Sequence, residues 1–179
     1  MKLFFDTCLE DLVIALLGKD SKLVSMVKLE SLKKKVDILP RIVNQILNEN
    51  NININDITDM YFNIGPGSFT GSRIALVYCR TIALFKPIKL HTYQTHELIN
   101  KQTNKKVIHI KASKYSAYQI IFNKDDSIES NKISTELFDS VDYDELLNNF
   151  NKYQSIFKEV TDIDSLETTY FHEAKIGGE

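Results

Sequence analysis

The stretch Gly65-Pro66-Gly67-Ser68-Phe69-Thr70-Gly71-Ser72-Arg73 decides the fold, because it joins a short apolar strand to a long apolar helix. Glycine, proline and serine together are typical of a tight turn, and the hydroxyl of Ser68 or Thr70 can cap the helix that follows. Such a junction also exposes backbone N–H groups that can bind phosphate. The stretch lacks the Gly-Lys-Ser/Thr ending of a Walker loop, the glycine spacing of a dinucleotide fold and the Gly-x-Ser-x-Gly of a nucleophile elbow. We therefore favour a capped structural turn over a phosphate site.

The helix after this turn is apolar on nearly every side. Only Arg73, Arg80 and the adjacent Thr81 mark a polar strip, since residues seven apart lie almost above one another on a helix. A helix that is apolar all round needs cover all round. The sheet and a second helix can cover two sides, which leaves the strip around Val77 and Leu84. Either the C-terminal segment of the chain or another polypeptide covers this strip.

Apolar patterning before the turn predicts a sheet and a helix. Segments at residues 3–7, 12–17 and 22–29 are typical of strands in an antiparallel meander. Residues 32–47 follow the helical period, and Pro40 either kinks this helix or lies in the first turn of one that begins near Asp37. The preceding Lys33-Lys34-Lys35 run is typical of a solvated face.

Further along the chain, a strand at residues 88–91 and a short helix at residues 92–100, opened by Thr92 or Thr95, complete the order βββαβαβα. The polar segment at residues 101–106 is the best candidate for a boundary between two lobes. We predict an α/β protein with an N-terminal lobe at residues 1–103 and a reduced C-terminal lobe at residues 104–179.

Composition narrows the classes of function. The chain has 179 residues, a formal net charge of −2 and two cysteines that lie far apart, Cys8 and Cys79. No global positive field attracts nucleic acid, and two reduced, buried thiols are expected rather than a disulfide framework. The apolar start is too short for a signal peptide and no run is long enough to span a membrane. We expect a cytoplasmic protein that does not bind membranes.

The residues around the glycine turn resemble one family closely. Ile64-Gly65-Pro66-Gly67-Ser68-Phe69-Thr70-Gly71-Ser72-Arg73-Ile74-Ala75-Leu76 resembles the hallmark of the TsaB (YeaZ) family. Further pieces follow in the family's order: Phe5-Asp6-Thr7, Ile38-Leu39-Pro40-Arg41-Ile42, Lys89-Leu90-His91, Lys111-Ala112-Ser113 with Ala117-Tyr118, and Thr169-Tyr170-Phe171. The resemblance is clear over about residues 1–122. It departs from the family at Lys34, where a histidine is usual, and at Lys111-Ala112-Ser113, where Asp-Ala-Arg is usual.

The resemblance implies an actin/hexokinase-like (ASKHA) fold of two lobes, each a mixed sheet flanked by helices, with the second lobe shortened here. It implies a non-catalytic subunit that binds the TsaD transferase, which attaches threonylcarbamoyl to adenosine 37 of ANN-decoding tRNAs. A TsaE-like ATPase would join the assembly, tRNA would be met only indirectly, and self-association through the same helices is a further possibility. Carried over, the partner interface comprises Ile38, Leu39, Ile42, Ile46, Arg73, Val77, Arg80, Thr81 and Leu84, and the motif loop comprises Gly65, Pro66, Gly67, Ser68, Phe69, Thr70 and Gly71.

The residues themselves do not favour an enzyme. His91 and His96 are five apart, a poor spacing for a metal pair on a helix. Asp6 lies where phosphotransferring relatives of the fold place a carboxylate, yet Thr7 and Cys8 follow it instead of glycine, so we expect it to cap a turn. We predict no catalytic residue, metal or cofactor. The alternative is a nucleotide-binding ATPase or kinase of the same superfamily, and a metallopeptidase is a third, weaker hypothesis.

Overall fold

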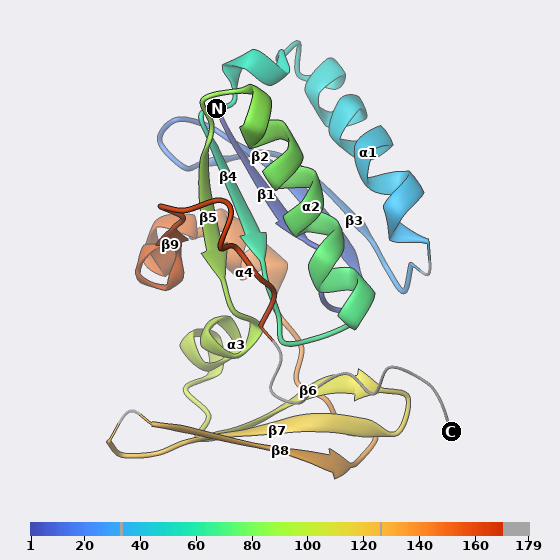
Figure 1. The fold of residues 1–179 in the computed structure, drawn as a ribbon, viewed down its shortest axis with the longest axis vertical. Helices are drawn as coiled ribbons and strands as arrows, with labels where there is room; N and C mark the ends of the chain where they lie inside the picture. The colour runs from blue at the N-terminus through green and yellow to red at the C-terminus, as the bar shows by residue number, and fades with distance from the viewer. Residues whose placement is uncertain (33, 126, 170–179) are drawn as a thin grey trace.

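The computed structural model describes residues 1–32, 34–125 and 127–169. In this part of the chain a main sheet has six strands in the order β3-β2-β1-β4-β5-β9, and a smaller sheet has three in the order β6-β7-β8 (Figure 1). The strands are β1 (Lys2–Asp6), β2 (Leu12–Leu17), β3 (Leu23–Leu29), β4 (Asp59–Asn63), β5 (Lys89–Tyr93), β6 (Val107–Ser113), β7 (Ser116–Phe122), β8 (Ile128–Ser134) and β9 (Lys158–Glu159). The helices are α1 (Lys35–Glu49), α2 (Phe69–Phe85), α3 (Thr95–Thr103) and α4 (Tyr143–Asn148), with 3-10 helices η1 (Ile54–Asp56) and η2 (Phe150–Ile156).

The centre of the main sheet is β1, which runs antiparallel to β2 and parallel to β4. β5 continues the parallel part beside β4, and β9 pairs antiparallel with β5. The carboxyl ends of β1, β4 and β5 therefore meet at one edge of the sheet. Their last residues, Asp6, Asn63 and Tyr93, are brought together there.

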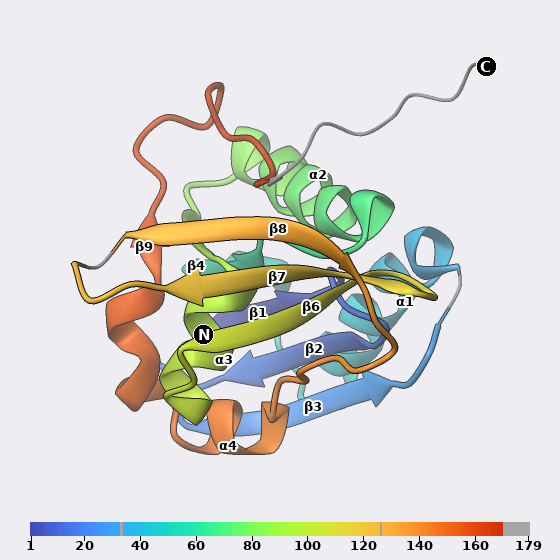
Figure 2. The ribbon, with the colours of Figure 1, turned by 90° about the horizontal axis from the view of Figure 1, so that it is seen from below.

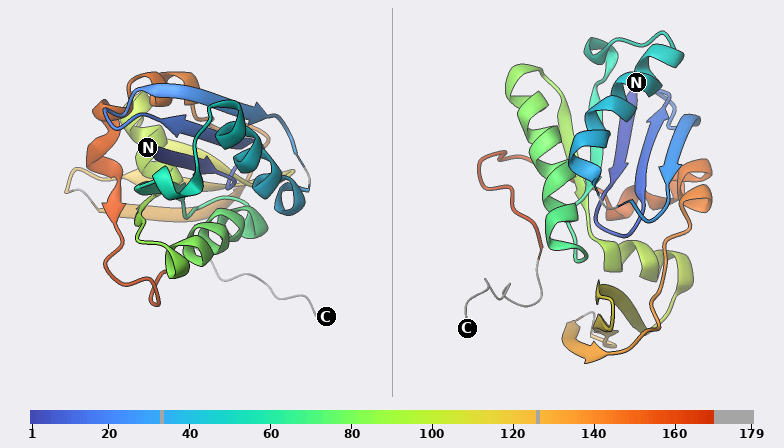
Figure 3. Two further views of the ribbon diagram at one scale, coloured as in Figure 1. Left: turned by 90° about the horizontal axis from the view of Figure 1, so that it is seen from above. Right: turned by 90° about the vertical axis from the view of Figure 1, so that its right-hand side faces the viewer.

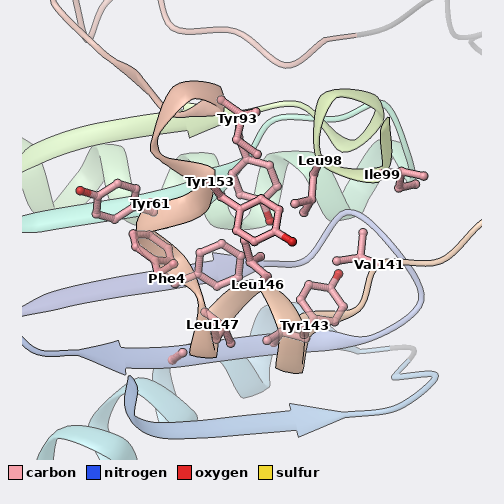
Figure 4. Close-up of a cluster of buried hydrophobic side chains, with 14 of the residues drawn as sticks. Phe4, Tyr61, Tyr93, Leu98, Ile99, Val141, Tyr143, Leu146, Leu147 and Tyr153 are labelled. Carbon is pink, nitrogen blue, oxygen red and sulfur yellow. The ribbon is translucent and has the colours of Figure 1, made fainter. Parts of the chain in front are cut away.

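Two apolar cores form on opposite faces of the main sheet, because successive side chains of a strand point to opposite sides. Leu3 and Phe5 pack with α1 and α2, whereas Phe4 packs with α3, α4 and η2. Figure 4 shows the second core, in which Phe4 stacks on Tyr93 with ring centroids 5.5 Å apart. α1 and α2 thus share one face of the sheet, and the C-terminal helices occupy the other (Figure 3).

The smaller sheet lies at the end of the molecule where the parallel strands finish (Figure 1), and it lies in front in the view from below (Figure 2). Ile108, Ile110 and Ile120 of β6 and β7 join the core beneath α3 and α4. After β8 the chain returns to the main sheet, where α4 and η2 pack and β9 pairs. The division into lobes at residues 1–103 and 104–179 stays a prediction. None of the helices in the described residues is long and apolar enough to cross a membrane.

The predicted order of strands and helices is found, with shifted ends. α1 begins at Lys35 and contains Pro40, and α2 begins at Phe69, inside the glycine turn. The predicted cap of α3 is wrong, because its N-cap residue is Gln94 and makes no side-chain capping bond. The Thr95 hydroxyl instead pairs with Asn63, at 2.9 Å from its Nδ2.

Candidate functional site

The glycine turn packs main chain against main chain. A Cβ atom at Gly71 would lie 2.2 Å from the Thr7 carbonyl oxygen, and one at Gly67 would lie 2.6 Å from that of Cys8. The Ser68 N–H donates to the Cys8 carbonyl at 2.8 Å, and the Thr7 hydroxyl donates to the Gly71 carbonyl at 2.6 Å. The two glycines are therefore required by close approach to the β1–β2 turn.

The helix cap is settled in favour of Ser68, whose hydroxyl accepts from the Gly71 N–H at 3.2 Å. At the other end of the motif, Gly65 has a φ of +107°, a conformation that only glycine adopts readily. A Cβ atom there would lie 2.7 Å from the Thr169 carbonyl oxygen, while the Thr169 N–H donates to the Ile64 carbonyl at 2.8 Å. The motif thus contacts both the β1–β2 turn and the C-terminal segment.

Asp6 is buried, and its carboxylate accepts hydrogen bonds from the protein. One oxygen accepts from the Cys8 N–H at 2.8 Å, which is the turn cap predicted from the sequence. The other accepts from Asn63 Nδ2 at 2.9 Å and from the Tyr93 hydroxyl at 2.8 Å. Burial and, next, the Asp6 charge raise the pKa of Tyr93 well above its ordinary value, so its hydroxyl keeps the proton that it donates. Asp6 therefore serves to organise the end of the sheet.

Both cysteines are buried and unpaired with each other. Burial raises the pKa of Cys8 and of Cys79 well above the ordinary thiol value. The Cys8 thiol donates to the Asn63 carbonyl at 3.2 Å. Neither thiol has the character of a nucleophile, because the reactive form is the thiolate.

A groove of about 610 Å³ separates α1 from α2 on the outer face of the main sheet. We call it the α1–α2 groove. It is lined by Val36, Leu39, Pro40, Phe69, Thr70, Arg73, Ile74, Val77, Tyr78, Thr81 and Ile82. In the described chain Val77, which lines the groove, is 58% exposed, and Leu84, further along α2, is 62% exposed. Contiguous apolar surface of this kind is typical of an interaction site.

Up to Thr169, where the described part of the chain ends, the C-terminal segment covers one side of α2. Asp164 forms an ion pair with Arg80 at 3.1 Å, and Ile163 and Leu166 pack against the core beneath α2. This segment leaves Val77 and Leu84 uncovered by the residues that the structure describes. Tyr170 and Phe171, which resemble part of the family's closing motif, lie outside those residues.

The predicted interface residues divide into exposed, half-buried and buried positions. Arg73, Val77, Thr81 and Leu84 are exposed; Ile38, Ile42 and Arg80 are half-buried; Leu39 and Ile46 are fully buried. Of the nine, Leu39, Arg73, Val77 and Thr81 line the groove. The role of all nine in binding a partner stays a prediction.

Sequence reasoning missed several residues at this site. Val36 and Tyr78 line the groove, and Val36 could have been found because it lies one helical turn before the predicted Leu39. Lys35 was expected on a solvated face, and this is wrong, since only 7% of it is exposed. Its neighbour Lys34 is exposed as expected, and Lys33 lies outside the described residues.

A second hollow, of about 1050 Å³, lies between the two sheets. The first residues of α1 and α2, the β1–β2 turn and residues 111–114 line it. Lys111, which replaces the usual aspartate of the family, forms an ion pair with Glu10. That pair links the smaller sheet to the β1–β2 turn.

One family model and two solved structures are similar to this chain. Residues 30–118 match the family model "TsaD: tRNA N6-adenosine threonylcarbamoyltransferase". No curated protein matches the chain.

Two solved structures share the fold. YeaZ from Pseudomonas aeruginosa has a TM-score of 0.55 at 15% identity, covering 75% of this chain and 67% of that one. The other is described as "an uncharacterized protein with similarity to peptidase YEAZ from Pseudomonas aeruginosa"; it has a TM-score of 0.56 at 18% identity, covering 78% and 68%. The mixed sheet flanked by helices is consistent with a shortened actin/hexokinase-like α/β fold. The family model and the shared fold are consistent with the resemblance of the glycine motif to the TsaB/YeaZ family.

Proposed function

We propose that this chain is the non-catalytic subunit that binds a TsaD-like transferase for threonylcarbamoylation of adenosine 37 in ANN-decoding tRNAs. The observation that carries the proposal is the apolar surface of α1 and α2 that the described residues leave uncovered, with the α1–α2 groove at its centre and Val77 and Leu84 exposed on α2. Burial of exposed apolar surface by a partner is favourable, because it removes that surface from water. The match of residues 30–118 to a TsaD family model supports a place in the same tRNA modification system.

The polar interior supports a binding role over a catalytic one. Asp6 and the main chain of Cys8 are engaged in hydrogen bonds to the protein itself. With a formal net charge of −2, the chain has no excess of cations to hold tRNA, so the partner would contact the nucleic acid. A TsaE-like ATPase completes the proposed cytoplasmic assembly.

The occupant of the groove is a TsaD-like protein rather than a second copy. Both could use the same helices, so the two associations compete in this proposal. Mixing the chain with the TsaD-like protein of the same source and measuring the mass of the species by light scattering separates them. A one-to-one heterodimer is expected, and a homodimer that persists at excess partner contradicts the proposal.

Substitution at Val77 tests the surface itself. Val77→Arg places a charge in an apolar contact and is expected to weaken heterodimer formation at least ~30-fold, the effect of losing about 2 kcal/mol at the centre of an interface. Leu84→Glu should act in the same direction. Val24→Arg is the matched control, because Val24 is 49% exposed on β3 and does not line the groove.

The free energy of unfolding of all three variants should lie within about 0.5 kcal/mol of the wild-type value, since the changed side chains are exposed. Wild-type affinity in Val77→Arg and Leu84→Glu would exclude this surface as the binding site. Equal weakening by Val24→Arg would exclude it as well.

A nucleotide-binding ATPase or kinase is the second candidate. The first residues of α1 and α2 line the hollow between the two sheets, and helix N-termini can bind phosphate. That candidate predicts Mg-ATP binding by calorimetry and turnover lost in Asp6→Ala. Tight binding with hydrolysis by the isolated chain would favour it over the binding subunit.

A further inference from the structure

Lys35 combines burial with three main-chain contacts. Its ammonium donates to the carbonyl of Thr7 at 3.0 Å, to that of Asp11 at 2.7 Å and to that of Leu9. An ammonium has three N–H donors, so these acceptors use its whole capacity. The side chain therefore ties the first residue of α1 to the β1–β2 turn.

This position is unfavourable for a cation in two ways. Burial removes water from the charge and lowers the pKa of Lys35, although nearby Asp6 acts in the opposite sense. The first turn of a helix also repels positive charge through the helix dipole. The three carbonyl contacts offset these terms, but they do so only while α1 keeps its place above the turn.

The same turn holds α2. The Thr7 carbonyl that accepts from Lys35 is also the atom that Gly71 approaches, and the Thr7 hydroxyl donates to the Gly71 carbonyl. The β1–β2 turn is consequently the common support of both helices. The α1–α2 groove opens at this support, since Val36 of α1 and Phe69 of α2 both line it.

We propose that Lys35 is a positioning residue for partner binding, which sets the place of α1 against α2 and so the shape of the α1–α2 groove. This inference rests on the proposed function. Lys35 lies outside the groove lining, so its effect on a partner is indirect. Its neighbour Val36 carries the effect to the surface.

The test compares Lys35→Met with Lys34→Met in the full chain. Methionine keeps the apolar stem and removes the charge and the donors, and Lys34 is an exposed lysine one residue away. Lys35→Met is expected to weaken binding of the TsaD-like protein at least ten-fold, whereas Lys34→Met leaves it within two-fold of wild type. Lys35→Gln, a neutral side chain that retains two donors, is expected to fall between them.

A second readout measures the position of α1 without any partner. Spin labels at Asn44→Cys on α1 and Lys89→Cys on β5, both exposed, report the distance from the helix to the sheet. The distance distribution should shift or broaden in Lys35→Met and stay unchanged in Lys34→Met. Cys8 and Cys79 are buried and should not take the label.

The two readouts separate the inference from the proposed function. If wild type does not bind the TsaD-like protein, the proposed function fails, and an unchanged distance in Lys35→Met overturns the positioning role independently. Undiminished binding in Lys35→Met overturns the inference, and so does weakened binding with an unchanged distance. Should Lys35→Met fail to fold, the same comparisons are made with Lys35→Gln.

Discussion

Gly71→Ala probes the close approach of α2 to the β1–β2 turn. In an ordinary helix this change stabilises by about 1 kcal/mol, because alanine has the higher helix propensity. Here the new methyl group would lie 2.2 Å from the Thr7 carbonyl oxygen and 3.1 Å from the Ser68 Cβ. The carbonyl belongs to the main chain and also accepts from Lys35, so it cannot move freely. We expect a net loss of about 1–3 kcal/mol, the usual effect of overpacking.

Urea denaturation at pH 7 measures this loss as a fall of about 1 M in the midpoint, given the m-values usual for small proteins. Gly18→Ala is the control, because its Cβ would meet Asp20 Oδ1 at 2.7 Å, at the end of an exposed side chain that can rotate away. It should change stability by less than about 0.5 kcal/mol. If Gly71→Ala is as stable as wild type or more stable, the close approach does not explain the glycine.

Three further predictions concern titration, reactivity and surface charge. Burial lowers the pKa of His96 from 6.5 to about 4, so the folded state stays neutral where the unfolded state binds a proton. The free energy of unfolding should therefore fall by roughly 3 kcal/mol as the pH drops from 6.5 to 4. His96→Phe should lack this part of the fall when the free energy of unfolding, measured with urea, is plotted against pH. The same pH dependence in wild type and His96→Phe would contradict the prediction. Cys8 and Cys79 should react with a thiol reagent only after unfolding, and rapid labelling of the native chain would contradict their burial. Arg80→Ala breaks an exposed ion pair with Asp164 and should shift the unfolding midpoint by the equivalent of less than about 1 kcal/mol; a larger shift would show that the pair anchors the C-terminal segment.

The order of elements could be predicted because it depends on local periodicity. Strands alternate or run apolar, and helices repeat every three to four residues, so β1 to β5 and α1 to α3 are visible in the sequence. Helix starts depend on tertiary contacts instead. The sequence suggested residue 32 or Asp37 for α1, and it begins at Lys35, whose ammonium is held by a turn more than twenty residues earlier in the chain.

The exposed part of the candidate site was predictable by counting the cover available. A helix apolar on every side needs more neighbours than a short chain supplies, and Val77 and Leu84 remain open in the described residues. For α1, the apolar residues cover so much of the helix surface that the sequence does not show which of them stay exposed. Ile38 and Leu39 are adjacent and both apolar, yet Leu39 is fully buried and Ile38 is half-buried, because side chains of adjacent residues point about 100° apart on a helix.

Different residues determine the shape of the α1–α2 groove and its surface chemistry. Its shape follows from two attachments to one turn, the glycine contact of Gly71 and the ammonium contact of Lys35, and both reach main-chain atoms. Its chemistry follows from outward side chains such as Val77. An apolar groove between two helices tends to close, because water is excluded when the walls meet. Attachments of both helices to the β1–β2 turn oppose that closure, so we expect substitutions on the outer faces to change what the groove binds and to leave its form unchanged.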